Sequence, residues 1–291
     1  MNNVNKNNIA SRDSRKMHVS DFTIASASDV RITRAVMRIV NNVMVKSGFG
    51  TLPESVKDAK TLEDVLKIII GKHPTKTLNF ERYTHVRGLP KYESIKSLIN
   101  ISPKDNIPIL DFGCGDCSLI HYMESINYTN LYGADIWNDD QAKEKERLDI
   151  ENFGYITKVR GRPVIPFKKK RFKYIFCLMV LHHIPIGEIP AILRVLYRRL
   201  ENGGYLIVRE HNCFNDEIKH NVFAEHFAHA NMVRSILAGK IVDVCESEHC
   251  QTYLSTTQWI DLIKTYKFRF VYSTESKTDT QKNYIMFKRC N

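Results

Sequence analysis

The chain of 291 residues carries 43 Lys and Arg against 32 Asp and Glu, so its formal net charge is +11. Its hydrophobic fraction of 43% and charged fraction of 26% are those of a soluble globular protein. The sequence has no run of 18 apolar residues, so we expect no transmembrane helix. The start is rich in Asn and Lys and has no apolar stretch, so we expect no secretory signal. The seven cysteines are scattered, which favours free thiols over a disulfide framework. We therefore expect a cytoplasmic protein with no membrane association.

The N-terminal part is polar and basic. Residues 1–20 are predicted to be a disordered tail, and residues 21–78 a helical, basic extension. The first 100 residues hold 17 Lys and Arg against 9 Asp and Glu, so most of the net charge lies there. A basic excess favours a polyanionic partner such as RNA. The alternative is a basic protein without such a partner.

Two helices are expected in this extension. Residues 28–46 place apolar side chains at helical spacing, with Arg31, Arg34 and Arg38 on another face. This basic amphipathic helix could bind RNA or a protein partner, or its charged face could be solvated. Residues 61–70 predict a second helix that ends at Gly71.

The segment 107–116, Ile-Pro-Ile-Leu-Asp-Phe-Gly-Cys-Gly-Asp, predicts a buried strand, a glycine turn and the start of a helix. Gly113 and Gly115 allow a tight turn and a close approach by a ligand. Free N–H groups at the start of a helix favour a nucleotide-like ligand. A dinucleotide-binding motif would need a third glycine where Ser118 stands, so that motif is not matched. Asp111 precedes the first glycine by two positions.

Three later motifs sharpen this interpretation. Residues 131–136 form a short strand ending in Asp135, an acid placed to accept both hydroxyls of a ribose. Residues 172–185 join an apolar strand to Val-Leu-His-His-Ile-Pro, and residues 200–208 join a helix end to a glycine pair and another strand. In this order the motifs resemble the class I S-adenosylmethionine-dependent methyltransferases over about residues 80–291.

The resemblance implies a Rossmann-like α/β fold with a seven-stranded doubly wound sheet and an antiparallel last strand. The domain would span residues 79–291, with a helical insertion at about 215–250. We expect a third strand at 156–159, a fifth at 205–209, and closing strands at 268–273 and 284–288. The implied cofactor is S-adenosyl-L-methionine. The cofactor-binding residues expected from the matched motifs are Arg87, Asp111, Phe112, Gly113, Cys114, Gly115, Asp135, Ile136 and Leu178.

Two features beside the expected pocket bear on how the cofactor is held, and the second departs from the family pattern. The helix predicted at 79–100 would cover the cofactor, with Tyr83 facing it and Arg87 pairing with the methionine carboxylate. A plain surface role is the alternative for both residues. After the third strand the family often has an acid for the adenine, but this chain has Arg160 and Gly161.

The catalytic residues expected from position are His182, Glu210 and His211. The Lys-Asp-Lys-Glu tetrad of similar ribose 2′-O-methyltransferases is absent, because Cys177-Leu-Met179 ends the fourth strand and Arg209 the fifth. His211 is a candidate general base near neutral pH, or else a structural hydrogen-bonding residue.

A metal site is not predicted. His211 and Cys213, with histidines and cysteines up to residue 250, could supply zinc ligands, but residues 211–250 contain no Cys-x-x-Cys. We expect His226 and His229 to line a lid over the substrate or to face water.

A second basic cluster precedes the fourth strand: Lys168, Lys169, Lys170 and Arg171. Together with Tyr83, Arg209 and the three N-terminal arginines, it is the candidate substrate surface for RNA. We therefore predict a methyltransferase that acts on RNA, at the cap or another nucleotide. The alternatives are a small-molecule methyltransferase and a non-catalytic RNA-binding subunit. Arg-Glu-His-x-Cys at 209–213 also resembles methyltransferase-like proteins of large DNA viruses, which favours a viral source.

Overall fold

The computed structural model describes residues 53–72, 80–99, 101–136, 149–242, 252–276 and 281–290, and the helical positions 37, 38, 41 and 45. The predicted disordered tail, most of the arginine helix and the charged segment 137–148 lie outside these residues. Among the described residues, no helix is long and apolar enough to cross a membrane.

One seven-stranded sheet organises the molecule, with the strand order β3-β2-β1-β6-β7-β9-β8. Strands β1, β2, β3, β6 and β7 are parallel, whereas β9 is antiparallel to both β7 and β8. The predicted doubly wound sheet with an antiparallel last strand is confirmed. The strands are β1 (Ile109–Phe112), β2 (Leu131–Asp135), β3 (Phe153–Tyr155), β6 (Phe172–Leu178), β7 (Leu200–His211), β8 (Phe268–Ser273) and β9 (Lys282–Arg289).

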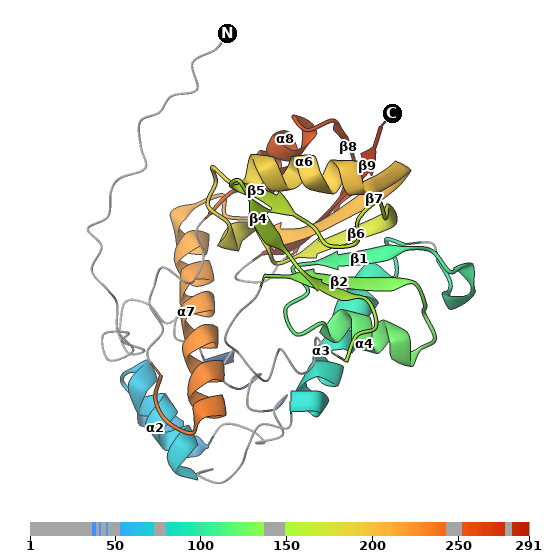
Figure 1. Ribbon diagram of the computed structural model, residues 1–291. Helices are drawn as coiled ribbons and strands as arrows, with labels where there is room; N and C mark the ends of the chain where they lie inside the picture. Colours follow the sequence, from blue (N-terminus) through green and yellow to red (C-terminus); the bar gives the residue numbers. More distant parts are fainter. Residues whose placement is uncertain are drawn as a thin grey trace.

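Helices cover both faces of the sheet (Figure 1). One face packs against α3 (Phe80–Ile95) and α4 (Ser118–Ser125), and the other against α6 (Ile189–Arg199) and α8 (Thr256–Lys264). Every residue of β1 is buried, because a central parallel strand is covered on both faces. Short 3-10 turns are η1 (Glu54–Asp58), η2 (Pro103–Asp105) and η3 (Leu181–His183).

The third strand differs from the prediction. Residues 153–155 pair with β2 as β3, while β4 (Thr157–Val159) pairs with β5 (Arg162–Val164) in a separate antiparallel hairpin. Arg160 and Gly161 have φ angles of +50° and +73°, the turn that suits a two-residue hairpin loop. They therefore close a hairpin and do not follow the third strand. The fifth strand is also longer than predicted, because pairing with β9 extends it to His211.

A second, smaller core lies beside the sheet. Helix α2 (Leu62–Lys72) packs against α7 (Asp216–Ala238), seen on the left of Figure 1. Leu62, Val65, Leu66 and Ile69 recur at helical spacing and bury one face of α2 against α7. The N-terminal extension and the insertion after β7 thus share one hydrophobic cluster, although they are far apart in the sequence.

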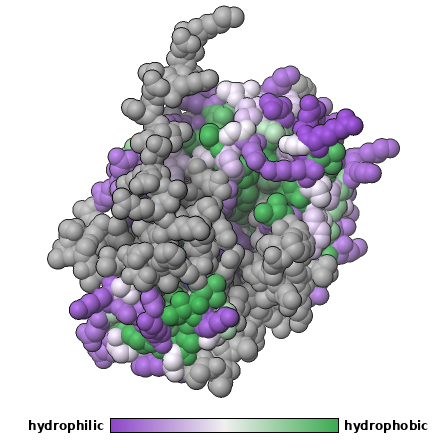
Figure 2. Space-filling model, turned by 60° about the vertical axis from the view of Figure 1, so that its left-hand side comes forward, coloured by the Kyte–Doolittle hydropathy of each residue, from purple (hydrophilic) through white to green (hydrophobic). Residues whose placement is uncertain are grey.

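The described surface is mixed in character. On the face shown in Figure 2, apolar patches alternate with hydrophilic side chains. Ile136, Val159, Ile186 and Phe214 are among the large apolar side chains that are exposed. Exposed apolar residues are common on folded proteins, so only their position gives them meaning. Ile136 directly follows the acid at the end of β2, where a nucleoside is expected.

Candidate active site

The glycine turn between β1 and α4 has the backbone that the sequence predicts. Gly113 and Gly115 have φ angles of +74° and +63°, which favour glycine. A Cβ on Gly113 would lie 2.5 Å from Val180, whereas one on Gly115 would meet no described atom within 4 Å. Gly113 therefore permits close packing against the segment after β6, and Gly115 leaves open space beside the turn.

Asp135 ends β2 next to this open space. Its Oδ2 accepts a hydrogen bond from the backbone N–H of Gly115 at 2.5 Å, and its Oδ1 accepts one from Ile136 at 2.7 Å. Ile136 itself is 61% exposed. A carboxylate offers about four lone-pair sites on its two oxygens, so we predict that Asp135 accepts ribose hydroxyls while it also supports the turn.

An ion pair with a buried carboxylate joins α3 to the glycine turn. Arg87 donates from Nη1 to Oδ2 of Asp116 at 2.7 Å, and Lys91 donates to Ser118 Oγ at 2.8 Å. Burial alone would raise the pKa of Asp116, but the positive charges of Arg87 and Lys91 outweigh it and hold that pKa well below its usual range. Arg87 therefore has an anionic partner within the protein, in addition to the cofactor carboxylate expected for it.

Asp111 is the second buried acid of the turn. It is 3% exposed. Burial raises its pKa to about 7, Lys91 opposes the shift, and the charges of Asp135 and Asp116 add to it. Three carboxylates thus face two nearby cations, Arg87 and Lys91. This excess of negative charge suits a ligand that brings positive charge to the turn.

A cysteine pair inside the turn was not predicted from the sequence. The Sγ atoms of Cys114 and Cys117 lie 2.6 Å apart, and both side chains are buried. Burial, followed by the contact with Cys117, raises the pKa of Cys114 well above its ordinary value. The signal was the Cys-x-x-Cys spacing at 114–117, which lies outside residues 211–250, where zinc ligands were considered.

The three residues expected to be catalytic lie at the carboxyl ends of β6 and β7. Glu210 Oε1 accepts hydrogen bonds from the backbone N–H groups of Val180 and Leu181, at 3.1 and 2.7 Å. Its Oε2 pairs with Nδ1 of His182. Burial raises the pKa of Glu210 and lowers that of His182. Glu210 thus fixes both the backbone of the segment after β6 and the ring of His182.

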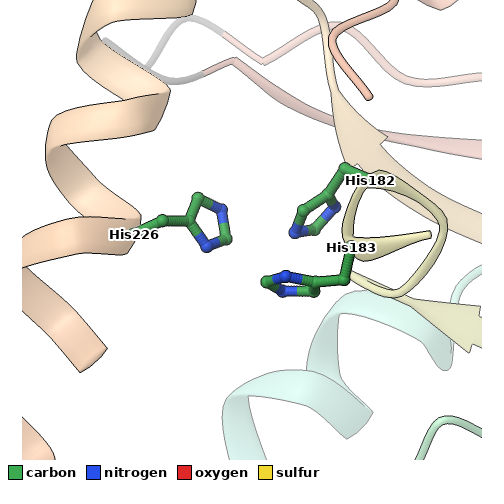
Figure 3. Close-up of side chains that lie close together, drawn as sticks. All are labelled: His182, His183 and His226. Atoms are coloured by element: carbon green, nitrogen blue, oxygen red, sulfur yellow. The ribbon is translucent and has the colours of Figure 1, made fainter. Parts of the chain in front are cut away.

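Histidines from three segments gather beside Glu210. Nε2 of His211 lies 3.0 Å from Nε2 of His226 on α7. One ring nitrogen of each of His182, His183 and His226 lies within 4.8 Å of the others, and the rings point toward one another (Figure 3). From the sequence, His226 was expected in a lid or in water, and His183 was not singled out. No local sequence pattern predicts that these histidines lie together, because His226 comes from the insertion after β7.

Residues 85–272 match the model of a family described as a methyltransferase domain. The chain belongs to this methyltransferase-domain family. The described residues form the seven-stranded sheet with antiparallel last strands of a Rossmann-like methyltransferase fold, and they place the predicted glycine turn beside Asp135. The resemblance found in the sequence motifs is therefore confirmed at the level of the family.

One named relative is similar over about half of this chain. The tRNA U34 carboxymethyltransferase of Nautilia profundicola is 31% identical over 165 residues, which cover 54% of this chain and 52% of that protein. The chain therefore spans about half the length of that relative.

Solved structures of methyltransferases are also similar. Human N-acetylserotonin methyltransferase in complex with S-adenosylmethionine is 15% identical, with a TM-score of 0.46, 91% of this chain and 68% of that chain covered. An S-adenosylmethionine-dependent methyltransferase of Methanosarcina mazei is 16% identical, with a TM-score of 0.47 and coverages of 68% and 98%. At TM-scores below 0.5, neither structure specifies the substrate or the site of this chain.

The methyltransferase domain uses S-adenosylmethionine, and the residues at the turn fit that cofactor. Gly115 leaves space beside the turn, Asp135 offers oxygen acceptors for the ribose, and Ile136 offers an apolar side chain for the adenine ring. Phe112 and Cys114 are buried, and Leu178 ends β6. Their direct contact with the cofactor stays a prediction. Tyr83 lies on α3, but its side chain is outside the described part of the chain.

The expected substrate residues fall into two places. Arg209 lies on β7 with its guanidinium 5.2 Å from the ring centre of Tyr284. The positive charges of Arg209 and Arg38 contribute to lowering the pKa of Lys282, after the larger effect of burial. Lys282 is paired in register with His211. Arg209 and Arg38 therefore lie near Lys282 and the histidines, whereas Arg31 and Arg34 lie outside the described residues.

The lysine cluster lies at the other edge of the sheet. Lys168–Arg171 directly precedes β6, whereas Glu210 and His182 lie near the carboxyl ends. The seven residues of β6 separate these edges by about 20 Å. Arg199 donates to the carbonyl oxygens of Ile165, Phe167 and Lys170, so this loop is well supported. The structure does not bring the cluster to the end of the sheet where Glu210 and His182 lie.

Proposed function

We propose that the whole chain is an S-adenosylmethionine-dependent methyltransferase that modifies RNA. The observation that carries the RNA proposal is the position of Arg38. This N-terminal arginine lies close enough to Lys282 to act on its pKa, and Lys282 is the β9 partner of His211. Arg38, one of the described positions of the basic extension, therefore lies near the edge where the histidines gather. A polyanion bound along the extension would pass beside the methyl acceptor position.

Overall charge and the Nautilia relative support the same proposal. The net charge is +11, which favours association with a polyanion. The Nautilia protein is named a tRNA U34 carboxymethyltransferase. A tRNA therefore belongs among the substrates to be tested, together with capped RNA.

The residues of the chain have distinct parts in the proposed reaction. Asp135 accepts the ribose hydroxyls of the cofactor, and Asp111 and Asp116 place negative charge beside its cationic groups. Transfer of a methyl group from a sulfonium needs in-line placement of the acceptor, so positioning is the main work of the protein. Glu210 positions the segment after β6, and His211 accepts the proton of a hydroxyl acceptor.

The test is a methyl-transfer assay with labelled S-adenosylmethionine against capped RNA, uncapped RNA, tRNA and a metabolite pool. Nucleoside mass spectrometry then identifies the methylated atom. We expect label in an RNA fraction, and its loss in Asp135→Ala. Label only in the metabolite pool would replace RNA with a small molecule. Folded protein that binds the cofactor but labels none of these substrates would support the non-catalytic alternative.

A further inference from the structure

We propose that His182, His183 and His226 form a binding site for a divalent transition-metal ion. Two of these histidines come from η3, after β6, and the third from α7. One nitrogen of each lies within 4.8 Å of the others (Figure 3). Three histidines form a known type of open zinc site, in which a fourth position remains for water or substrate.

His182 has the hydrogen-bonding pattern of a metal ligand. Its Nδ1 is engaged by the carboxylate of Glu210. Its Nε2, among the described residues, has no hydrogen-bond partner although the residue is only 1% exposed. A buried nitrogen without a partner costs free energy, and a carboxylate on the opposite nitrogen is the usual support of a metal-bound histidine. Glu210 thus both orients the ring and makes its free nitrogen a better donor to a metal.

The other two histidines complete the geometry. The ring centres of His182 and His183 lie 4.1 Å apart, and that of His226 lies 4.7 Å from His182 and 5.0 Å from His183. Metal–nitrogen bonds of about 2.0–2.1 Å would require the rings to turn toward one another as the ion binds. His211, 3.0 Å from Nε2 of His226, is placed to orient that third ring.

The donor set and the nearby charges select the class of ion. Imidazole nitrogen suits Zn²⁺ and neighbouring transition metals, whereas Mg²⁺ and Ca²⁺ require oxygen ligands. Near the cluster, Lys282 is paired with Glu225, so its positive charge is compensated. His183 is exposed while His182 is buried, so the open side of the cluster faces outward. Water or an oxygen atom of a substrate could take the fourth position there.

This placement would give the ion a part in methyl transfer. The cluster follows the carboxyl ends of β6 and β7, as does the proposed acceptor position. A bound ion would orient a hydroxyl acceptor and lower its pKa, in a chain that lacks the Lys-Asp-Lys-Glu tetrad. This role rests on the proposed function, but the existence of the site does not.

The experiment measures metal binding directly. The full chain is stripped with a chelator, dialysed, and titrated with ZnCl₂ in a calorimeter, with CoCl₂ absorption spectra as a second readout. We expect one equivalent of Zn²⁺, a Co²⁺ spectrum with nitrogen ligation, and at least tenfold weaker binding in His183→Ala and in His226→Ala. The matched control is His220→Ala, an exposed histidine on the same helix α7, which should bind like the wild type.

Two further measurements keep the outcomes distinct. Glu210→Gln should weaken Zn²⁺ binding about 10- to 100-fold, because it removes the charged support of His182. S-adenosylmethionine affinity should be the same in His183→Ala and the wild type, which separates this proposal from the proposed function. Absence of Zn²⁺ binding in the folded wild type would overturn the site. Equal binding in wild type, His183→Ala and His226→Ala would also overturn it, by placing the ion elsewhere, such as at Cys114 and Cys117.

Discussion

Arg87 of α3 donates a hydrogen bond to the buried carboxylate of Asp116 across 2.7 Å. The helix that precedes the sheet is thereby fastened to the glycine turn that follows β1. Lys91, one turn further along α3, lies 3.8 Å from the same carboxylate. A guanidinium has five N–H donors, so Arg87 can keep this partner and also bind the carboxylate of a cofactor. We therefore predict that stability of the turn and recognition of the cofactor both depend on Arg87.

Asp116→Asn should destabilise the protein at pH 7 by about 1–3 kcal/mol, because Arg87 and Lys91 lose their anionic partner. The pKa of Asp116 is lowered in the folded state, so its ionic contribution is present above the unfolded pKa of about 3.9. It is lost as the pH falls through the folded pKa. Urea unfolding of both proteins should show the largest difference near neutrality and a smaller one below about pH 4. A difference that does not vary with pH would contradict the ion pair.

Asp111 predicts a pH dependence of cofactor binding. Its pKa is raised to about 7 in the folded chain, so it is partly protonated at neutral pH. A cofactor that brings positive charge favours the ionised form, so affinity should rise as the pH rises through about 7 and then level off. The increase for one linked proton is at most about tenfold per pH unit. Calorimetric titration at several pH values measures it, and Asp111→Asn should flatten the profile.

Asp135→Ala should weaken S-adenosylmethionine binding by about tenfold or more, because each hydrogen bond to a charged acceptor contributes roughly 1.5–3 kcal/mol. The variant also removes the acceptor for the N–H of Gly115. A melting curve must therefore accompany the titration. Asp149→Ala, at an exposed acid, is the control and should bind normally. Unchanged affinity in a folded Asp135 variant would rule out the assignment of the ribose.

Arg38 and the lysine cluster at 168–171 should differ in how they affect RNA binding and methyl transfer. Arg38→Gln should weaken RNA binding and reduce the log–log salt slope by roughly 0.7 for each phosphate that is no longer neutralised. The double variant Lys168→Gln/Lys169→Gln should weaken RNA binding. It should not change the rate of methyl transfer at saturating RNA, because this loop lies at the opposite edge from Glu210. Filter binding at several salt concentrations and single-turnover rates measure both effects.

Lys264→Gln, an exposed lysine on α8, controls for the removal of one charge. It should leave both RNA affinity and the rate near those of the wild type. If Arg38→Gln behaves like this control, the arginine face is solvated and the RNA proposal loses its main support. Reduced cofactor binding in Arg38→Gln would instead mean that the extension acts on the glycine turn.

The sequence by itself determined the fold and the position of the cofactor turn. Gly113 and Gly115 stand where the backbone requires positive φ, and Asp135 ends the next buried strand. Such requirements are local, because a glycine turn, an apolar strand or a helix face depends on residues close together in the chain. The order of these elements then limits the topology, since parallel strands joined by helices allow few arrangements.

Only the tertiary structure decided the register of the third strand and the composition of the histidine cluster. Short segments such as 153–155 and 157–159 can each pair as strands, and the choice depends on whether β2 or β5 is the partner. His226 lies beside His182 and His211 because α7, which packs against α2, also passes the end of β7. Long-range packing makes these choices, and no local pattern encodes them.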